Sequence, residues 1–221
     1  MTQHLHRGVE RLKSQLLALG SMVERCLQDA LTAFESGDVV AAKRIIAADE
    51  HIDLLEVEVE EDCLKLLALH QPVAADLRFI VSVLKINSDL ERIADFAVSI
   101  SWSIVDRGAL PDGAPSFSLA LMKDQAQAMV REVLRAVIEV DCSRARTVLK
   151  MDDVVDAEKR RIQREIMAEI KRHPGFVEAL SSILSVARSL ERIADHATNI
   201  AEDVIYMVEG DIVRHGRLLA H

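Results

Sequence analysis

The hexapeptide LERIAD occurs twice in this 221-residue chain, and the two copies begin one hundred residues apart. Each copy contains a Glu and an Asp at a spacing of four, Glu91 with Asp95 and Glu191 with Asp195. On a helix, side chains four residues apart lie on one face, with Cβ atoms about 5–6 Å apart. Two carboxylates placed in this way can bind a cation, or they can form ordinary surface ion pairs.

Each copy is preceded by a second pair of acidic residues at the same spacing. Both pairs of each half lie about 20 residues from the proline that separates them, Pro72 or Pro174. If this proline marks the turn between two antiparallel helices, both pairs lie about 30 Å from it, at the same height. Each half can then gather four carboxylates on adjacent helices, although the sequence does not fix whether they face one another. The upstream pairs are Asp49 with Asp53 and Asp152 with Asp156.

Two interpretations of these clusters remain open. In the first, the clusters are solvated faces with local ion pairs, such as Arg92 with Asp95 and Arg188 with Glu191. In the second, each cluster binds a multivalent cation, because four uncompensated carboxylates repel one another and raise their own pKa values. All-oxygen ligands suit magnesium, manganese, calcium or iron, and zinc less typically.

Apolar residues recur at helical spacing through both halves of the chain. A heptad stripe from Leu5 through Leu12 and Leu19 predicts a first long helix that ends at "ESGD". We expect Asp38 to cap a second helix reaching about His70, and a third helix to follow Pro72. The second half repeats this order, with helices over about 117–140, from the Asp141 cap to about 173, and after Pro174.

The repeat predicts an all-α fold of two tandem three-helix bundles. We expect the bundles to cover residues 1–108 and 116–214. Between them lies "DRGALPDGAPS", which has two Gly and two Pro among eleven residues. This composition is typical of a linker, here placed near 110–115.

Composition excludes several classes of protein. The net charge of -9 argues against nucleic-acid binding, which needs clustered cations. Only 3% of residues are aromatic, so the core must be aliphatic. Three scattered cysteines form no CxxC pair, and no apolar run is long enough for a membrane span. With no signal-peptide pattern at the N-terminus, these features predict a cytoplasmic protein that contacts membranes only through partners.

Catalytic motifs are missing from the sequence. No His follows a Glu by three residues, so the di-iron signature Glu-x-x-His is absent. The sequence also has no phosphate-binding Gly-rich loop and no nucleophile motif. We therefore expect a non-enzymatic protein, either a regulatory adaptor or a metal store or chaperone.

Three segments resemble the PhoU family of phosphate-uptake regulators in prokaryotes. They are "DEHID" from residue 49, "QPVAADLRFIVSVLKINSDLERIAD" from residue 71, and "SLERIADHATNIAED" from residue 189. The resemblance covers nearly the whole chain and implies two three-helix bundles with multinuclear metal clusters on their surfaces. By this resemblance the metal ligands are the eight residues Asp49, Asp53, Glu91, Asp95, Asp152, Asp156, Glu191 and Asp195. After its motif the second half has His196 and Asn199, as the family usually does, and these two are additional candidate ligands by the resemblance. The first half has Phe96 and Ser99 there, so the two halves are not equivalent.

The resemblance also implies a function and partners. It predicts a negative regulator of the phosphate-starvation response that binds iron, manganese, magnesium or zinc. The implied partners are the ATPase subunit of the high-affinity phosphate transporter and the sensor histidine kinase of the phosphate two-component system. Whether the chain forms a homodimer stays open.

Overall fold

The computed structural model describes residues 3–107, 115 and 117–210, and nearly all of them are helical. The first half contains α1 (Gln3–Ser36), α2 (Val39–Ala48), α3 (Glu50–His70) and α4 (Ala74–Arg107). The second half contains α5 (Ala120–Glu139), α6 (Cys142–Arg172), the short 3₁₀ helix η1 (Pro174–Phe176) and α7 (Val177–Glu209). The described residues include no strand, so the predicted all-α fold is confirmed.

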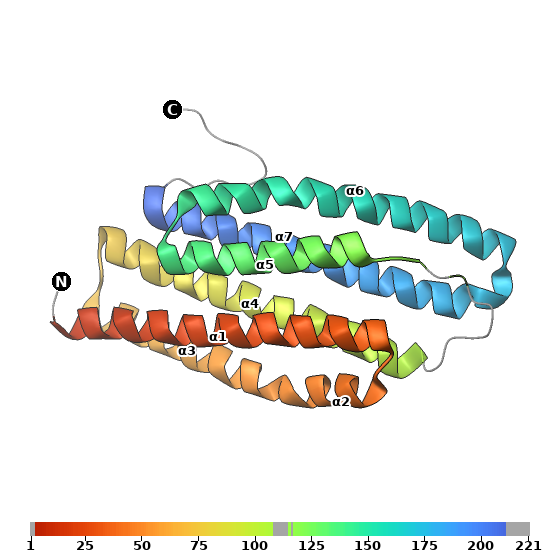
Figure 1. Ribbon diagram of the computed structural model, residues 1–221. Coiled ribbons are helices and arrows are strands. Elements are labelled where there is room, and N and C mark those ends of the chain that lie inside the picture. The colour runs from red at the N-terminus through yellow and green to blue at the C-terminus, as the bar shows by residue number, and fades with distance from the viewer. Residues whose placement is uncertain (1–2, 108–114, 116, 211–221) are drawn as a thin grey trace.

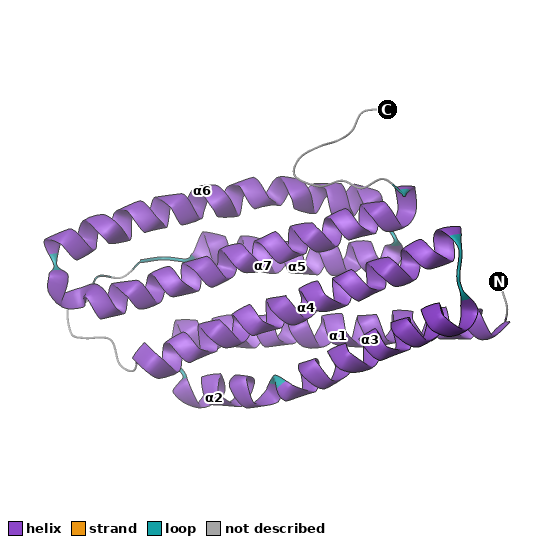
Figure 2. Cartoon of the chain, turned by 180° about the vertical axis from the view of Figure 1, so that it is seen from behind, coloured by secondary structure: helices purple, strands orange, loops and turns teal. Residues whose placement is uncertain are grey.

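The helices form two bundles that lie side by side (Figure 1). α1, α4 and the α2–α3 pair make the first bundle, and α5, α6 and α7 make the second. α4 and α7 run antiparallel along each other at the centre (Figure 2). Lys85 near the start of α4 therefore meets Asp203 near the end of α7, whereas Ser103 meets Ser182.

The buried side chains of both bundles form one continuous apolar cluster. Heptad residues of α1 such as Leu12, Leu19 and Val23 are fully buried, as the sequence predicted. Within the described residues, none of the fully buried hydrophobic side chains is aromatic, in agreement with the expected aliphatic core. α1 also meets α5 at Gly20, where a Cβ atom would lie only 2.6 Å from Cδ2 of Leu134. No helix in the described ranges is both long and apolar enough to cross a membrane.

Two predicted helix boundaries differ from those of the structure. The single helix expected from Asp38 to His70 is divided at Asp49, where the backbone N–H of Ile52 bonds to the Asp49 carbonyl at 2.7 Å. Asp49 keeps helical dihedrals, φ -60° and ψ -36°, so a tight turn and not a loop joins α2 to α3. α5 begins at Ala120, three residues later than predicted. The expected linker lies largely in 108–114 and 116, outside the described residues.

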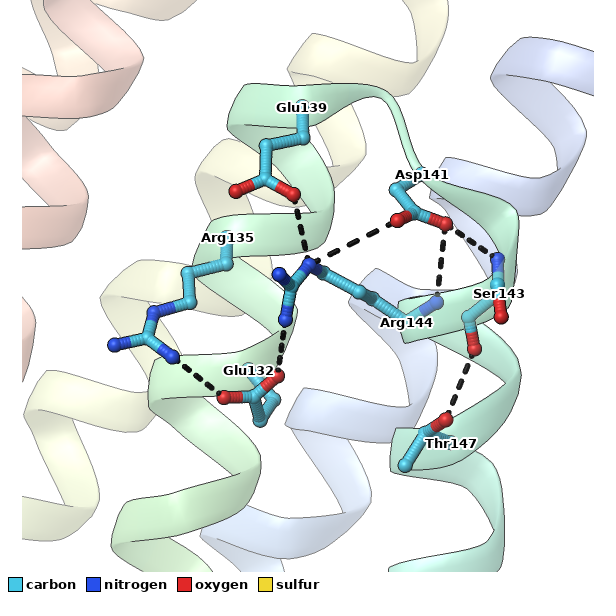
Figure 3. A network of polar contacts seen from close by, with 7 residues as sticks. All are labelled: Glu132, Arg135, Glu139, Asp141, Ser143, Arg144 and Thr147. Carbon is cyan, nitrogen blue, oxygen red and sulfur yellow. Dashed lines mark hydrogen bonds and ion pairs between the residues drawn. The ribbon is translucent and has the colours of Figure 1, made fainter.

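Both predicted N-caps are present, and the cap of α6 belongs to a wider polar network (Figure 3). Asp38 Oδ1 accepts from the Ala41 N–H at 2.9 Å. Asp141 Oδ1 accepts from the N–H groups of Ser143 and Arg144 at 2.7 and 3.2 Å. The Arg144 guanidinium in turn donates to Glu139 and Glu132 on α5. This network fixes the turn at which the chain passes from α5 to α6.

We expect Asp141→Ala to lower the free energy of unfolding by about 1 kcal/mol, the usual cost of losing an N-cap. Urea unfolding followed by circular dichroism measures this change. Glu165→Ala is the control, since it removes only the exposed ion pair with Arg161 and should cost less than about 0.5 kcal/mol. Equal losses in the two variants would contradict the capping role.

Candidate metal centres

The structure brings the four predicted carboxylates of the first half together at the α3–α4 contact. Burial, followed by repulsion from the charges of Asp53 and Asp95, raises the pKa of Asp49 to about 6. Burial, followed by repulsion from Asp95, Glu56 and Asp53 and opposed by Arg92, raises the pKa of Glu91 to about 6. Each of these carboxyl groups therefore lies within electrostatic range of others on the facing helix.

The second half builds the same arrangement between α6 and α7. Burial is the largest cause that raises the pKa of Asp152 to about 6. Repulsion from four neighbouring carboxylates adds to it, in the order Asp195, Asp156, Asp153 and Glu191. The pKa of Asp195 is raised by burial and by Glu191, against the lowering effect of Arg192. The side chains of Glu91 and Glu191 are only 24% and 21% exposed, and those of Asp95 and Asp195 are both 40% exposed. The clusters are thus half-buried between helices.

Nearby cations bind part of each cluster. Arg92 contacts Asp95 at 3.0 Å, as the sequence predicted. Glu191 is paired with Lys159 of α6 at 2.7 Å, and not with Arg188 as expected. Two further ion pairs in the second cluster are Arg160–Asp156 at 2.9 Å and Arg192–Asp195 at 3.3 Å.

Asp49 and Asp152 differ from these paired groups. Within the described residues neither forms an ion pair, and both have pKa values raised to about 6. Oδ1 of Asp49 is buried and has no hydrogen-bond partner in the described part of the chain. A buried oxygen without a donor is costly, and a cation would satisfy it.

The donor set of both clusters fits a hard divalent cation. All four side chains in each cluster offer oxygen, the ligand that magnesium, manganese and calcium prefer. As the side chains lie, no three Asp, Glu, His or Cys residues of the described ranges converge closely enough to hold a metal ion. Binding would therefore require the paired carboxylates to turn from Arg92, Lys159, Arg160 and Arg192 toward the cluster centre.

His196 and Asn199, the two additional candidates, are directed toward α4. Nδ1 of His196 lies 2.7 Å from Oδ1 of Asp89, and Nδ2 of Asn199 donates to the same oxygen at 3.2 Å. The His196 ring also lies against Phe96, with 5.7 Å between ring centroids. These two residues tie α7 to α4, and in the described structure their side chains form no hydrogen bond or ion pair with the carboxylates of Glu191 and Asp195.

Asp89 is a residue that reasoning from the sequence missed. It lines a polar groove of about 530 Å³ between α4 and α7. In the same groove the ammonium of Lys85 binds Asp203 at 2.6 Å and lies 5.5 Å from the centre of the Tyr206 ring. The sequence did contain a signal for this residue. When the two halves are aligned, Asp89 corresponds to Ser189, so an acidic residue stands where the other half has a serine. The groove residues are Lys85, Ser88, Asp89, Thr198, Asn199, Glu202 and Asp203.

The raised pKa values predict how the metal-free protein responds to pH. Asp49, Glu91 and Asp152 have folded-state values near 6, above those of an unfolded chain. In this range the folded state binds more protons than the unfolded state, so stability falls as pH rises from about 4 through 6. We expect the melting temperature in chelator to be higher at pH 5.5 than at pH 7.5.

A matched variant tests the source of this pH dependence. Asp49→Asn with Asp152→Asn removes two of the titrating groups while keeping their size, so the difference between the two pH values should shrink. Thermal unfolding by circular dichroism at both pH values provides the measurement. An unchanged difference in the variant would show that other groups cause it.

Comparison with known proteins identifies the family of this fold. The model of the PhoU domain matches the chain twice, over residues 16–104 and 119–204. A PhoU homolog of Pseudomonas putida, a phosphate-specific transport system accessory protein, is 37% identical over 97% of this chain and 84% of its own length. The protein of that name from Escherichia coli K12 is 32% identical over 94% of this chain and 86% of its own.

A solved structure supports the same assignment. The crystal structure of PhoU from Pseudomonas aeruginosa superposes with a TM-score of 0.88. It is 36% identical and covers 93% of this chain and 99% of that one. Since the two matched segments fall in the two bundles, and since the identity extends over nearly the whole length, the chain belongs to the PhoU family.

Proposed function

We propose that this protein is an accessory regulator of high-affinity phosphate uptake and a negative regulator of the phosphate-starvation response. The observation that carries the proposal is the similarity of both bundles to proteins named phosphate-specific transport system accessory proteins. The protein would act in the cytoplasm as an adaptor, without catalysis. Its partners would be the ATPase subunit of the phosphate transporter and the sensor histidine kinase.

We further propose that the two carboxylate clusters bind metal ions, with iron, manganese, magnesium and zinc as candidates. Support comes from the oxygen-only donors, from the raised pKa values and from the unpartnered Oδ1 of Asp49. A bound cation supplies positive charge that removes the repulsion among the carboxylates. The carboxylates of the first cluster join α3 to α4, and those of the second join α6 to α7.

Each cluster therefore lies where it can control the relative position of two helices. When the four carboxylates attract a shared cation and no longer repel one another, the two helices are held together at that height. If a partner binds the resulting surface, its affinity is coupled to metal occupancy, and the coupling acts equally in both directions.

A binding experiment with the two partners tests this function. We expect the tagged protein to retain the transporter ATPase subunit and the sensor kinase in a pull-down. We expect manganese to raise either affinity by about 5–150-fold, the range typical of allosteric coupling. If neither partner is retained with or without metal, the adaptor function is wrong. If both bind with unchanged affinity, only the metal dependence is wrong.

A metal store would behave differently in the same protein. With two clusters of four carboxylates, an adaptor should saturate at a few ions per chain, whereas a store should take up many more. Metal titration followed by elemental analysis of the washed protein separates these functions.

A further inference from the structure

The outer face of α3 carries apolar side chains that the bundle does not use. Leu54, Val57 and Leu64 are 62%, 49% and 52% exposed. Their spacings of three and seven place them on one side of the helix. The buried residues of the same helix, Ile52, Val59 and Cys63, occupy the opposite side. We call Leu54, Val57 and Leu64 the α3 stripe.

The second bundle contains a natural control for this surface. α6 aligns with α3 at the offset of 103 that relates Asp49 and Asp53 to Asp152 and Asp156. The buried positions of the two helices coincide in this alignment. α3 buries Ile52, Val59 and Cys63, and α6 buries an apolar residue at each corresponding position, namely Val155, Ile162 and Ile166. The outer face is not kept. In place of the α3 stripe, α6 has Ala157, Arg160 and Met167.

The charges around the two faces differ as well. α3 contains seven acidic residues and only one lysine. The aligned stretch of α6, residues 153–173, contains five acidic residues and six lysines and arginines. Exposed Glu50, Glu60 and Glu61 lie beside the α3 stripe, and of these Glu61 is paired with Lys65. The same fold therefore presents an apolar, acidic surface on one bundle and a more basic surface on the other.

Folding alone does not explain this difference. Both helices bury the same three core positions, so the bundle does not require exposed leucines at 54 and 64. Exposed apolar side chains aligned on one helix, with mostly acidic side chains beside them, are typical of a helix that packs against a partner. The acidic flanks select a cationic partner and disfavour the anionic surface of a bilayer.

From this arrangement we propose that the α3 stripe docks an amphipathic helix of a partner protein. That helix has an apolar stripe of its own and lysines or arginines on both sides. Its apolar residues cover Leu54, Val57 and Leu64, and its cations face Glu50, Glu60 and Glu61. The proposal rests on the adaptor function proposed above and assigns it a surface. Neither carboxylate cluster is required for the apolar contact.

A synthetic peptide tests the surface without depending on the identity of the partner. The probe is a fluorescein-labelled 15-residue helix of leucine and lysine, with leucines at spacings of three and four, and binding is measured by fluorescence anisotropy at about 0.15 M salt. We expect saturable binding to the full chain. We expect Leu54→Ser with Leu64→Ser to weaken it by about tenfold or more, since the variant removes two of the three apolar side chains that the peptide covers.

The control variants come from the aligned helix. Val154→Ser with Met167→Ser removes exposed apolar side chains of α6, which are 40% and 45% exposed, and should leave the peptide affinity unchanged. Circular dichroism checks that both double variants keep the helical fold, as expected for exposed positions. Glu50→Lys with Glu60→Lys should weaken binding of the leucine–lysine peptide and strengthen binding of a leucine–glutamate peptide.

Several outcomes would overturn the proposal. Among them are absence of saturable peptide binding, and equal losses in the α3 and α6 variants. Sedimentation that shows self-association, lost in the α3 variant, would assign the stripe to a second copy of the chain. Co-sedimentation with phosphatidylserine vesicles, also lost in the α3 variant, would assign it to a membrane. None of these results alters the pull-down with the transporter ATPase and the kinase, so the adaptor function can survive the loss of this surface.

Discussion

A variant that combines Glu191→Ala with Asp195→Ala will lose metal binding at the second cluster and keep its helices. Both residues lie on α7, and both repel Asp152 across the contact with α6. Without them only Asp152 and Asp156 remain as oxygen donors in that cluster. We expect the metal affinity of this site to fall by more than about 100-fold, because even changes to groups that only support a ligand cost 10–100-fold.

The fold should tolerate this change. Glu191 and Asp195 contribute ion pairs with Lys159 and Arg192, and such partly exposed pairs contribute little to stability. Their removal also relieves repulsion on Asp152, whose pKa should fall back toward its ordinary value. The metal-free variant should therefore unfold at a urea concentration close to that of the wild type, or slightly above it.

Calorimetric titration with manganese and elemental analysis of the dialysed protein measure the result. The matched control is Glu158→Ala with Glu165→Ala on α6, which removes two carboxylates that bind Arg161 and lie outside the cluster. This control should retain the full metal content. Full metal content in the α7 double variant would instead show that the second cluster does not bind metal.

The comparison of sequence and structure shows which features local patterns can reveal. Helix α1 follows directly from its heptad stripe, because burial of one face is recorded in spacing along a single helix. The N-caps at Asp38 and Asp141 are similarly local, since their bonds reach only two or three residues ahead. The break at Asp49 left no signal, because the backbone there stays helical and needs neither Gly nor Pro.

Features that depend on how helices face one another were harder to predict. The spacing of the acidic residues predicted that both pairs of a cluster lie at the same height along two adjacent helices. It did not predict which sides of those helices carry them. Glu191 illustrates the limit: the sequence offered Arg188 on the same helix as a partner, whereas the structure supplies Lys159 from α6. His196 stands beside Asp195 in the sequence, yet successive residues of a helix point in different directions, and its ring bonds to Asp89 on α4. Sequence therefore identified the members of each cluster better than their contacts.

Deletion of the gene encoding this protein should switch on phosphate-starvation genes in cells that grow in high phosphate. The adaptor would report sufficiency to the sensor kinase, and without it the kinase would receive no such report. A phosphatase or transporter reporter in the deletion strain measures the effect, and the wild-type gene on a plasmid should reverse it. A deletion strain whose reporter stays silent in high phosphate would refute the regulatory function.

Complementation with defined variants then separates the two surfaces. If the clusters control docking, Glu191→Ala with Asp195→Ala should restore repression only in part, because the first cluster stays intact. If the α3 stripe binds the partner, Leu54→Ser with Leu64→Ser should fail to restore repression, although the variant folds and retains both clusters. Val154→Ser with Met167→Ser changes the corresponding helix of the other bundle, so it should restore repression fully. Full repression by all three variants would mean that the regulatory contact lies elsewhere on the bundles, and the polar groove between α4 and α7 would then be the next surface to alter.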